Sequence, residues 1–355
     1  MTETHRVRVL VVDDSALMRK LLGDILSSDP RIEVIGTAFD GQDGLEKILA
    51  LSPDVVTLDV EMPRKDGLAL LEEIMRTRPV PVVMVSSLTQ EGAEVTLKAL
   101  SLGCVDFVGK PSGSISTNIQ VVGDELIAKV VMASTARIRA LRASLTPPPP
   151  VSIPVRRSPA RGGRGRREIV AIAASTGGPM ALHQLLAALP GNFPLPIVVT
   201  QHMPKGFTAL FAKRLDAVSP LEVVEGVEGL ALKPGLVVIA PGGSHLLVRR
   251  KGAETFCALS DAPPVLSVKP SANIMFLSVA DEFGGNVLGV VLTGMGRDGA
   301  DGSVALHGKG ARIIAESRQT CVVYGMPRAA VETGAVDEVL PLPEIPGALV
   351  RNASG

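Results

Sequence analysis

The sequence predicts an α/β protein built from two doubly wound parallel-sheet domains. Three observations support this fold class: the chain is 355 residues long, short apolar runs alternate with amphipathic stretches in both halves, and residues 146–167 between the halves show no apolar periodicity. The length suits about two domains of ~150 residues each. Apolar runs separated by helical patterns are typical of parallel strands covered by helices on both faces. We therefore expect domains at 1–128 and 168–355, joined by a helix and a linker over 129–167.

The first half carries five strand-like runs. The run at 7–12 ends at two aspartates, and apolar residues then recur 3, 4, 7 and 8 positions after Met18, as they do on one face of a helix. Further strands are expected at 33–38, 55–58, 82–85 and 105–108, and a last helix at roughly 119–143. Five strand–helix units in about 130 residues favour a parallel sheet.

The second half repeats the pattern with different contents. Strands are expected at 169–174, 197–200, 236–240, 287–292 and 312–315. The first of them leads into STGGP and then into a helix with leucines on one face. Pro179 stands where the first turn of that helix tolerates a missing amide. The second half is therefore expected to be a second α/β domain.

The segment between the halves, TPPPPVSIPVRRSPARGGRGRR at 146–167, has six prolines, six arginines and no acidic residue. Proline removes amide donors and glycine raises backbone entropy, so we expect an extended, mobile tether. A contact with a polyanion is a possible alternative use of its charge, but a solvated, self-repelling linker is the commoner explanation.

Composition disfavours several classes of protein. Lys+Arg and Asp+Glu both number 36, there is no Trp and one Tyr, and no helix-turn-helix pattern stands out, so nucleic-acid binding gains no support. The three cysteines form no CxxC pair and are expected to be reduced thiols. No apolar run approaches the ~18 residues of a membrane span, and the start of the sequence lacks the apolar core of a signal peptide. We expect a cytoplasmic protein without direct membrane insertion.

Charged and hydroxyl side chains gather at the predicted strand ends of the first domain. Asp13 and Asp14 follow the first strand, Asp59 the third, Ser86 the fourth and Lys110 the fifth. In an open α/β sheet, ligands bind at the carboxyl ends of the strands. Three carboxylates at one point favour a hard cation such as Mg²⁺, and a lysine and a hydroxyl suit phosphoryl oxygens. Taken singly, the aspartates also suit a helix cap and the lysine a surface charge.

The motifs VLVVDDSALMRKLL, LDVEMPRKDG, VMVSS and DFVGKP resemble the response-regulator receiver domain, which has a flavodoxin-like fold, from residue 6 to about 128. The resemblance implies that Asp59 accepts a phosphoryl group from a histidine kinase. It implies an Mg²⁺ site formed by Asp14, Asp59 and the main-chain carbonyl of Glu61, with Asp13 contributing to the acidic pocket. It also assigns phosphoryl contacts to Ser86 and Lys110, and the aromatic switch position to Phe107.

The strand ends of the second domain carry STGGP, QHMP, APGGSH and TGMGRDG. Glycine-rich turns can bind a dinucleotide phosphate, but neither a G-x-G-x-x-G motif nor a P-loop lysine is present. Alternatively, Ser175 is the nucleophile of a hydrolase, although its surroundings are not the G-x-S-x-G elbow of the α/β-hydrolases.

The residues by themselves do not select the base for such a serine. His5 is close to the terminus, and His183 and His307 fall in helical stretches. His202 and His245 both follow strand-like runs, and these two alternatives stay open. Asp298, in a glycine-rich turn, suits either an orienting carboxylate or the cap of the helix that starts nearby.

The segments IVAIAASTGGP, VVTQHMP, VVIAPGGSH, GVVLTGMGRDG and CVVYGMPRAAVETGAVDEVLPL resemble the catalytic domain of the chemotaxis protein-glutamate methylesterases, the CheB family, from about 168 to 344. The resemblance implies a Rossmann-like esterase domain with Ser175 as nucleophile, His202 as base, Asp298 as its orienting group and the Met295 N–H as oxyanion donor. The family commonly reads PSVD where this chain has PSAN at 270–273, and we expect this departure to affect the substrate rim at most.

The combined resemblance implies a phosphorylation-regulated enzyme of chemotaxis adaptation. Its substrates would be γ-glutamyl methyl esters on the cytoplasmic helical bundle of chemoreceptors, with deamidation of particular receptor glutamines by the same acyl route. Mg²⁺ would serve the receiver, and the esterase would need no cofactor. We further hypothesise that the unphosphorylated receiver covers the active site, since a tether makes even a weak contact effective. The alternatives are a receiver tethered to a non-enzymatic binding module and, less favoured, a DNA-binding response regulator.

Overall fold

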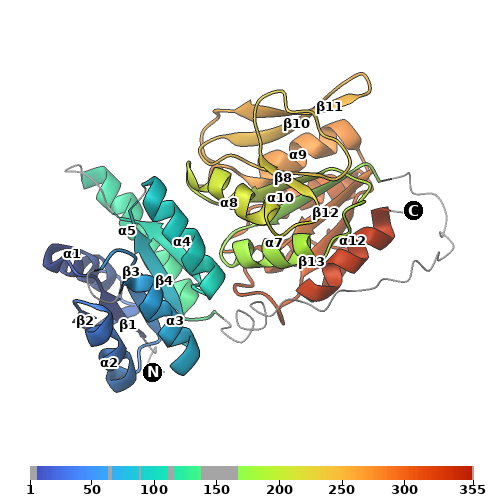
Figure 1. The fold of residues 1–355 in the computed structure, drawn as a ribbon. Coiled ribbons are helices and arrows are strands. Elements are labelled where there is room, and N and C mark those ends of the chain that lie inside the picture. Colours follow the sequence, from blue (N-terminus) through green and yellow to red (C-terminus); the bar gives the residue numbers. More distant parts are fainter. Residues whose placement is uncertain (1–5, 63–65, 88, 111–115, 137–166, 354–355) are drawn as a thin grey trace. The chain divides into compact units, whose positions relative to one another are not determined.

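The structure, a computed structural model, forms two compact units, residues 1–145 and 146–355, which are described separately (Figure 1). The residues described are 6–62, 66–87, 89–110, 116–136 and 167–353. The predicted linker lies outside them except for Arg167, which is buried against the second unit.

The first unit alternates strands and helices throughout. Its elements are β1 (Val7–Val12), α1 (Ala16–Ser27), β2 (Ile32–Ala38), α2 (Gly41–Leu51), β3 (Val55–Asp59), α3 (Gly67–Thr77), β4 (Val82–Ser86), α4 (Gln90–Leu102), β5 (Asp106–Gly109) and α5 (Ser116–Ala133). The described strands form a parallel sheet in the order β2-β1-β3-β4-β5. On its faces, α1 packs beside α5, while α2, α3 and α4 form a second row (Figure 1). This is the doubly wound arrangement that the sequence predicts.

Local chemistry explains where these elements begin. The strands β3 and β4 are buried along their whole length, as apolar runs between two helical layers must be. Ser15, and neither of the two aspartates before it, caps α1, because its hydroxyl accepts the Met18 N–H. Asp13 and Asp14 are therefore left at the carboxyl end of β1 with their side chains available for other contacts.

The second unit is larger and contains one additional layer. Its elements are β6 (Ile169–Ala174), α7 (Gly178–Ala187), β7 (Ile197–Gln201), α8 (Phe207–Asp216), β8 (Glu222–Glu225), β9 (Leu236–Ile239), β10 (His245–Lys251), β11 (Glu254–Ser260), α9 (Ala272–Phe283), β12 (Val287–Val291), α10 (Ala300–Gly308), β13 (Arg312–Glu316), α11 (Met326–Glu332), β14 (Glu338–Leu340), a 3₁₀ turn (Leu342–Glu344) and α12 (Ile345–Ala353). The main sheet is parallel, in the order β14-β13-β12-β6-β7-β9-β8. Pro179 lies in the first turn of α7, as predicted.

The strand order reverses at β6. From β6 the chain adds β7, β9 and β8 on one side, and later returns to add β12, β13 and β14 on the other. The helices α9, α10 and α11 cover one face, and α7, α8 and α12 the other (Figure 1). A crevice opens at the carboxyl ends of the strands wherever the order reverses in this way, and open α/β sheets bind their ligands there. The carboxyl ends of β12, β6 and β7 are therefore the place to look for a site.

Three features differ from the sequence prediction. The edge strands β8 and β14 of the main sheet were not expected. The strands β10 and β11 pair as an antiparallel hairpin outside the main sheet and pack on α9, although no hairpin was expected. The helix expected at 119–143 begins at Ser116 and ends at Ala133, after which the described chain forms a turn to residue 136. Residues 137–143 lie outside the described part. Among the helices that are described, none combines the length and apolar character needed to cross a bilayer.

Candidate functional site

Ser175 and His202 directly follow two neighbouring strands. The last residues of those strands, Ala174 and Gln201, are register partners, and the His202 N–H donates to the Ala174 carbonyl at 3.1 Å. The Gln201 side-chain amide donates to the carbonyl oxygens of both Ser175 (3.0 Å) and His202 (3.1 Å). The backbones of the two predicted catalytic residues are thus tied together by Gln201, whose role the sequence analysis missed.

A glycine turn after β12 approaches the serine from the other side. The Ser175 N–H donates to the carbonyl of Thr293 at 3.1 Å. At Gly294 an added Cβ would lie 2.8 Å from the Ser175 Cβ, so only glycine permits this approach. Met295 follows, and within the described residues its N–H donates to no protein acceptor. The turn therefore carries an available amide donor past the serine.

His202 is held by a carboxylate from the same turn region. Its Nε2 lies 2.8 Å from Asp298 Oδ2, and the Asp298 side chain is almost fully buried. Because an ionised carboxylate only accepts hydrogen bonds, the Nε2 atom carries the proton and Nδ1 is the nitrogen with a free lone pair. The imidazole is thus fixed in one tautomer.

The Asp298 carboxylate is placed at the amino end of α9. Besides His202, it accepts hydrogen bonds from the Ser271 hydroxyl (2.8 Å), the Ala272 N–H (2.6 Å) and the Asn273 N–H (3.0 Å). A helix amino end stabilises negative charge. Burial alone would raise the pKa of Asp298, but the hydrogen bonds from His202, Asn273 and Ser271 bring it below its usual value. This carboxylate stays charged.

These contacts correct two interpretations made from the sequence. Asp298 does not cap the nearby helix α10, whose N-cap is Gly299 without a side-chain hydrogen bond. The segment 270–273 is not a rim. Its Ser271 and Asn273 are buried, and Asn273 Oδ1 accepts the N–H groups of Gly299 (2.9 Å) and Gly302 (2.8 Å), which fixes the turn that bears Asp298. The expectation that the PSAN departure touches only the substrate rim is therefore wrong. Asn273 and Asp298 are 25 residues apart in the chain, so no local sequence pattern shows that they are in contact.

His245, the alternative base, lies elsewhere in the hydrogen-bond network. It opens β10, is fully buried, and uses both ring nitrogens: Nε2 is 3.1 Å from the Pro263 carbonyl and Nδ1 accepts the Ser271 N–H at 3.0 Å. A neutral imidazole with both nitrogens engaged has no lone pair free for a serine proton. Of the other histidines, His183 and His307 lie on α7 and α10, and His5 is outside the described residues.

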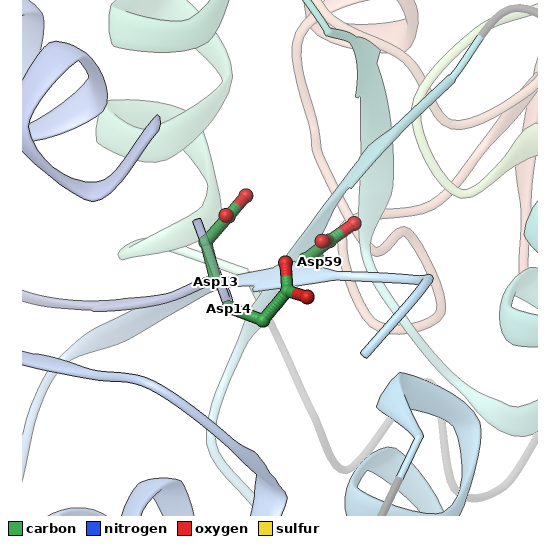
Figure 2. Close-up of side chains that lie close together, drawn as sticks. All are labelled: Asp13, Asp14 and Asp59. Atoms are coloured by element: carbon green, nitrogen blue, oxygen red, sulfur yellow. The ribbon is translucent and has the colours of Figure 1, made fainter. Parts of the chain in front are cut away.

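The first unit gathers three carboxylates at the ends of β1 and β3. Figure 2 shows Asp13, Asp14 and Asp59 together, and one oxygen of each lies within 4.8 Å of the others. Asp13 and Asp59 are buried and Asp14 is exposed. No hydrogen bond reaches Asp13 Oδ2 from the described residues. Carboxylate oxygens crowded in this way fit a hard divalent cation such as Mg²⁺.

Lys110 lies beside this cluster, with Nζ 2.7 Å from Asp59 Oδ2 and 3.6 Å from Asp13 Oδ2. Burial raises the pKa of Asp59 to about 6, and repulsion from Asp13 adds to this while Lys110 opposes it. Burial raises the pKa of Asp13 too. One lysine thus leaves the carboxylates incompletely compensated.

The remaining predicted receiver residues have other contacts. The Ser86 hydroxyl is buried and lies 3.3 Å from the Gly92 carbonyl, with no hydrogen bond to Asp59. The Glu61 N–H donates to Asp59 Oδ1 at 3.2 Å. Phe107 is buried, with the Lys129 ammonium 5.3 Å from its ring centroid and 2.6 Å from its carbonyl oxygen. Lys110 is therefore the residue that joins the acidic cluster directly.

Comparisons with known proteins cover both units. The family described as CheB methylesterase matches residues 170–349, and the response regulator receiver domain matches residues 9–118. The protein-glutamate methylesterase/protein-glutamine glutaminase of Symbiobacterium thermophilum is 53% identical over 97% of this chain and 96% of its own length. Its counterpart from Pyrococcus abyssi is 47% identical over 98% and 94%.

The second unit is similar to a domain of known structure. The crystal structure of the Thermotoga maritima CheB methylesterase catalytic domain aligns with a TM-score of 0.51 and 42% identity, and covers 52% of this chain and 98% of that domain. The relatives match nearly the whole of this chain, receiver region included. The chain therefore belongs to the CheB methylesterase family, with a response regulator receiver domain preceding the esterase domain.

Proposed function

We propose that this enzyme removes methyl groups from γ-glutamyl methyl esters of chemoreceptors by a Ser175–His202–Asp298 mechanism. The observation that carries the proposal is the His202–Asp298 hydrogen bond of 2.8 Å at the strand end next to Ser175. An isolated serine hydroxyl is a weak nucleophile at neutral pH, and an adjacent base held by a third group supplies its activation.

The first half of the reaction forms an acyl-enzyme. The Nδ1 atom of His202 takes the Ser175 hydroxyl proton while Oγ attacks the ester carbonyl. The Met295 N–H donates a hydrogen bond to the oxyanion that develops. When the tetrahedral intermediate collapses, the C–O bond to the methoxy group breaks, and methanol leaves with the proton that His202 returns.

The second half restores the enzyme. Water loses a proton to His202 and attacks the acyl carbon, and collapse returns the proton to Ser175 and frees the glutamate carboxylate. A γ-carboxamide can enter by the same route, with ammonia leaving in place of methanol, and this accounts for glutamine deamidation. Asp298 stays ionised throughout and stabilises the imidazolium that His202 becomes in both halves.

We further propose that Asp59 is the phosphoacceptor of the receiver and that a histidine kinase is the donor. Asp13, Asp14 and Asp59, with the Glu61 carbonyl, would hold Mg²⁺, which neutralises charge on the incoming phosphoryl group. Ser86 and Lys110 would bind its oxygens. Phe107 would take the switch position, and the esterase rate would depend on the phosphorylation of Asp59. We propose domain bounds of 1–128 and 168–355 with a linker between, and the cytoplasm as location.

The direct test is mass spectrometry of a methylated chemoreceptor cytoplasmic fragment before and after incubation with the full-length enzyme. We expect losses of 14 mass units at particular glutamates (~14 Da for exchange of CH₃ for H by hydrolysis), and none with Ser175→Ala. A serine-directed phosphonate should label Ser175 in the wild-type chain. Methyl loss that persists in Ser175→Ala would refute the mechanism, and labelling confined to another serine would reassign the nucleophile.

A further inference from the structure

A buried carboxyl group behind the proposed active site has no part in the mechanism so far. Glu316 is the last residue of β13 and is fully buried. Burial raises its pKa to about 7, although the hydrogen bond from the Thr293 N–H favours the charged form. Within the described residues, its buried Oε1 atom has no hydrogen-bond partner. Burying an acid of this kind costs free energy of folding unless its contacts compensate for the burial.

Its contact leads directly to the nucleophile. Glu316 Oε2 accepts the N–H of Thr293 at 2.8 Å, and the Thr293 carbonyl accepts the Ser175 N–H at 3.1 Å. The Thr293 hydroxyl donates to the Thr176 carbonyl at 2.9 Å and accepts the Val323 N–H at 3.0 Å. The N–H, carbonyl and hydroxyl groups of Thr293 therefore all form hydrogen bonds, and the partner of the N–H is Glu316.

We propose that Glu316 is a positioning residue of the esterase, which fixes the Thr293–Met295 turn against Ser175 and so sets the oxyanion donor. The inference rests on the proposed function, since it assumes that the Met295 N–H donates to the oxyanion. Gly294 lies between the fixed amide of Thr293 and that donor and has no side chain to restrain the turn. Its backbone is held by the Gly294 N–H to the Val323 carbonyl (3.1 Å) and by the Met326 N–H to the Gly294 carbonyl (2.8 Å), and Glu316 anchors the residue that precedes these contacts. A displacement of about 1 Å in such a donor can cost ~10²-fold in rate.

The Glu316 carboxyl acts here through its reach. The glutamate side chain is long enough for its oxygen to accept the Thr293 N–H. An uncharged acceptor on a side chain of the same length can accept the same N–H. A shorter carboxylate does not, because one methylene less withdraws the oxygen from the Thr293 amide. Reach and charge can therefore be separated by two conservative variants, Glu316→Gln and Glu316→Asp.

The experiment measures kcat and KM of the full-length chain on a methylated receptor fragment, with Ser175→Ala in parallel. Glu316→Gln is expected to keep kcat within about 3-fold, and Glu316→Asp to lose about 10- to 100-fold in kcat with KM nearly unchanged. The matched control is Ser278→Ala, which removes the acceptor of another buried amide, Val248 N–H (3.0 Å), on α9, away from the turn. It should lower the melting temperature and keep kcat.

The outcomes separate the two proposals. If Ser175→Ala abolishes turnover while Glu316→Asp keeps the wild-type kcat, the positioning role is refuted and the mechanism stands. If Gln loses more than Asp, the Glu316 charge matters instead of its reach, and the inference is overturned. Should Ser175→Ala retain turnover, the proposed function itself fails. If kcat falls as much for Ser278→Ala as for Glu316→Asp, the loss reflects lower stability in general, and the positioning role of Glu316 is overturned.

Discussion

Asp59 ends a strand of one parallel sheet and Asp298 lies in the turn after a strand of the other, and both are buried. Their environments nevertheless shift their pKa values in opposite directions. Asp298 accepts the hydrogen bonds of a helix amino end, a serine hydroxyl and a histidine, and these lower its pKa. Asp59 has one lysine and a backbone N–H against burial and a neighbouring carboxylate, and its pKa is raised to about 6.

The difference shows how one topology serves two purposes. A carboxylate surrounded by donors keeps its charge and can hold an imidazole in place through many turnovers. A carboxylate crowded by others is poorly compensated until a cation is bound. The esterase unit thus contains a well-compensated charge, whereas the receiver unit contains one that its described neighbours compensate incompletely.

The largest effects are expected from removing the nucleophile and the base that depend on Asp298. Ser175→Ala and His202→Ala are each expected to lower kcat by about 10⁴-fold or more, because nucleophile and base act as a unit. His245→Ala should keep activity within about 10-fold while losing stability, since a buried N–H, that of Ser271, is left without its acceptor. Initial-rate measurements decide this. A dead His245→Ala enzyme beside an active His202→Ala enzyme would reverse the assignment of the base.

Asp298→Asn changes the charge itself and is expected to lower kcat by about 10³-fold or more. Its amide group would have to face an N–H donor on either side, and it no longer stabilises the imidazolium. Asp281→Asn is the control, because that carboxylate is exposed and pairs with Lys309 on the surface. Steady-state kinetics on the same receptor fragment checks the expectation. Near-wild-type kcat for Asp298→Asn would show that the fixed charge is dispensable.

Asp59→Asn sharpens the other side of the comparison. The variant should incorporate no phosphoryl group from an acyl phosphate with Mg²⁺, and its esterase rate should not rise with the donor. Chelation of Mg²⁺ in the wild-type chain should have the same effect, because the remaining carboxylates repel the incoming phosphate. Phosphoprotein gel shifts and ester hydrolysis are measured together, with exposed Asp24→Asn as control. Full phosphorylation of Asp59→Asn would place the acceptor at another residue.

The smallest expected effect concerns the pH dependence of stability. Because the pKa of Glu316 is raised from 4.5 to about 7 by burial, the unfolded chain loses this proton first as the pH rises. Stability of the esterase unit should therefore fall between pH 4.5 and 7, by up to about 3 kcal/mol from this group. Glu316→Gln should flatten that fall in calorimetric scans across this range. An unchanged slope would mean that Glu316 does not titrate there.

Much of the receiver site was predictable because it depends on strand ends. Carboxyl ends of parallel strands meet at one edge, so residues far apart in sequence, such as Asp13, Asp59 and Lys110, could be grouped without coordinates. Ser86 was grouped by the same reasoning, whereas Phe107 was assigned only through the resemblance to receiver domains. Their side-chain contacts, with the Gly92 carbonyl and the Lys129 ammonium, depend on how helices pack over the sheet.

In the esterase unit, the pattern did not distinguish two histidines that each follow an apolar run. Only pairing shows that His202 follows a strand beside Ser175, whereas His245 begins a hairpin strand and is buried. The misjudged segment at 270–273 has the same cause. Its residues matter because they bind Asp298, which is distant in sequence. An amphipathic pattern shows which face of a helix is buried, but not which distant residue that helix contacts.

The sequence by itself determined the two α/β domains, the strand ends and the chemistry carried at those ends, because periodicity and residue type are local properties of the chain. The tertiary structure alone decided which histidine meets Asp298, which helix stabilises that carboxylate and how a buried glutamate reaches the turn beside Ser175. Those outcomes depend on hydrogen bonds between segments 23 to 96 residues apart, whose geometry is set only when the sheet order and helix packing are complete.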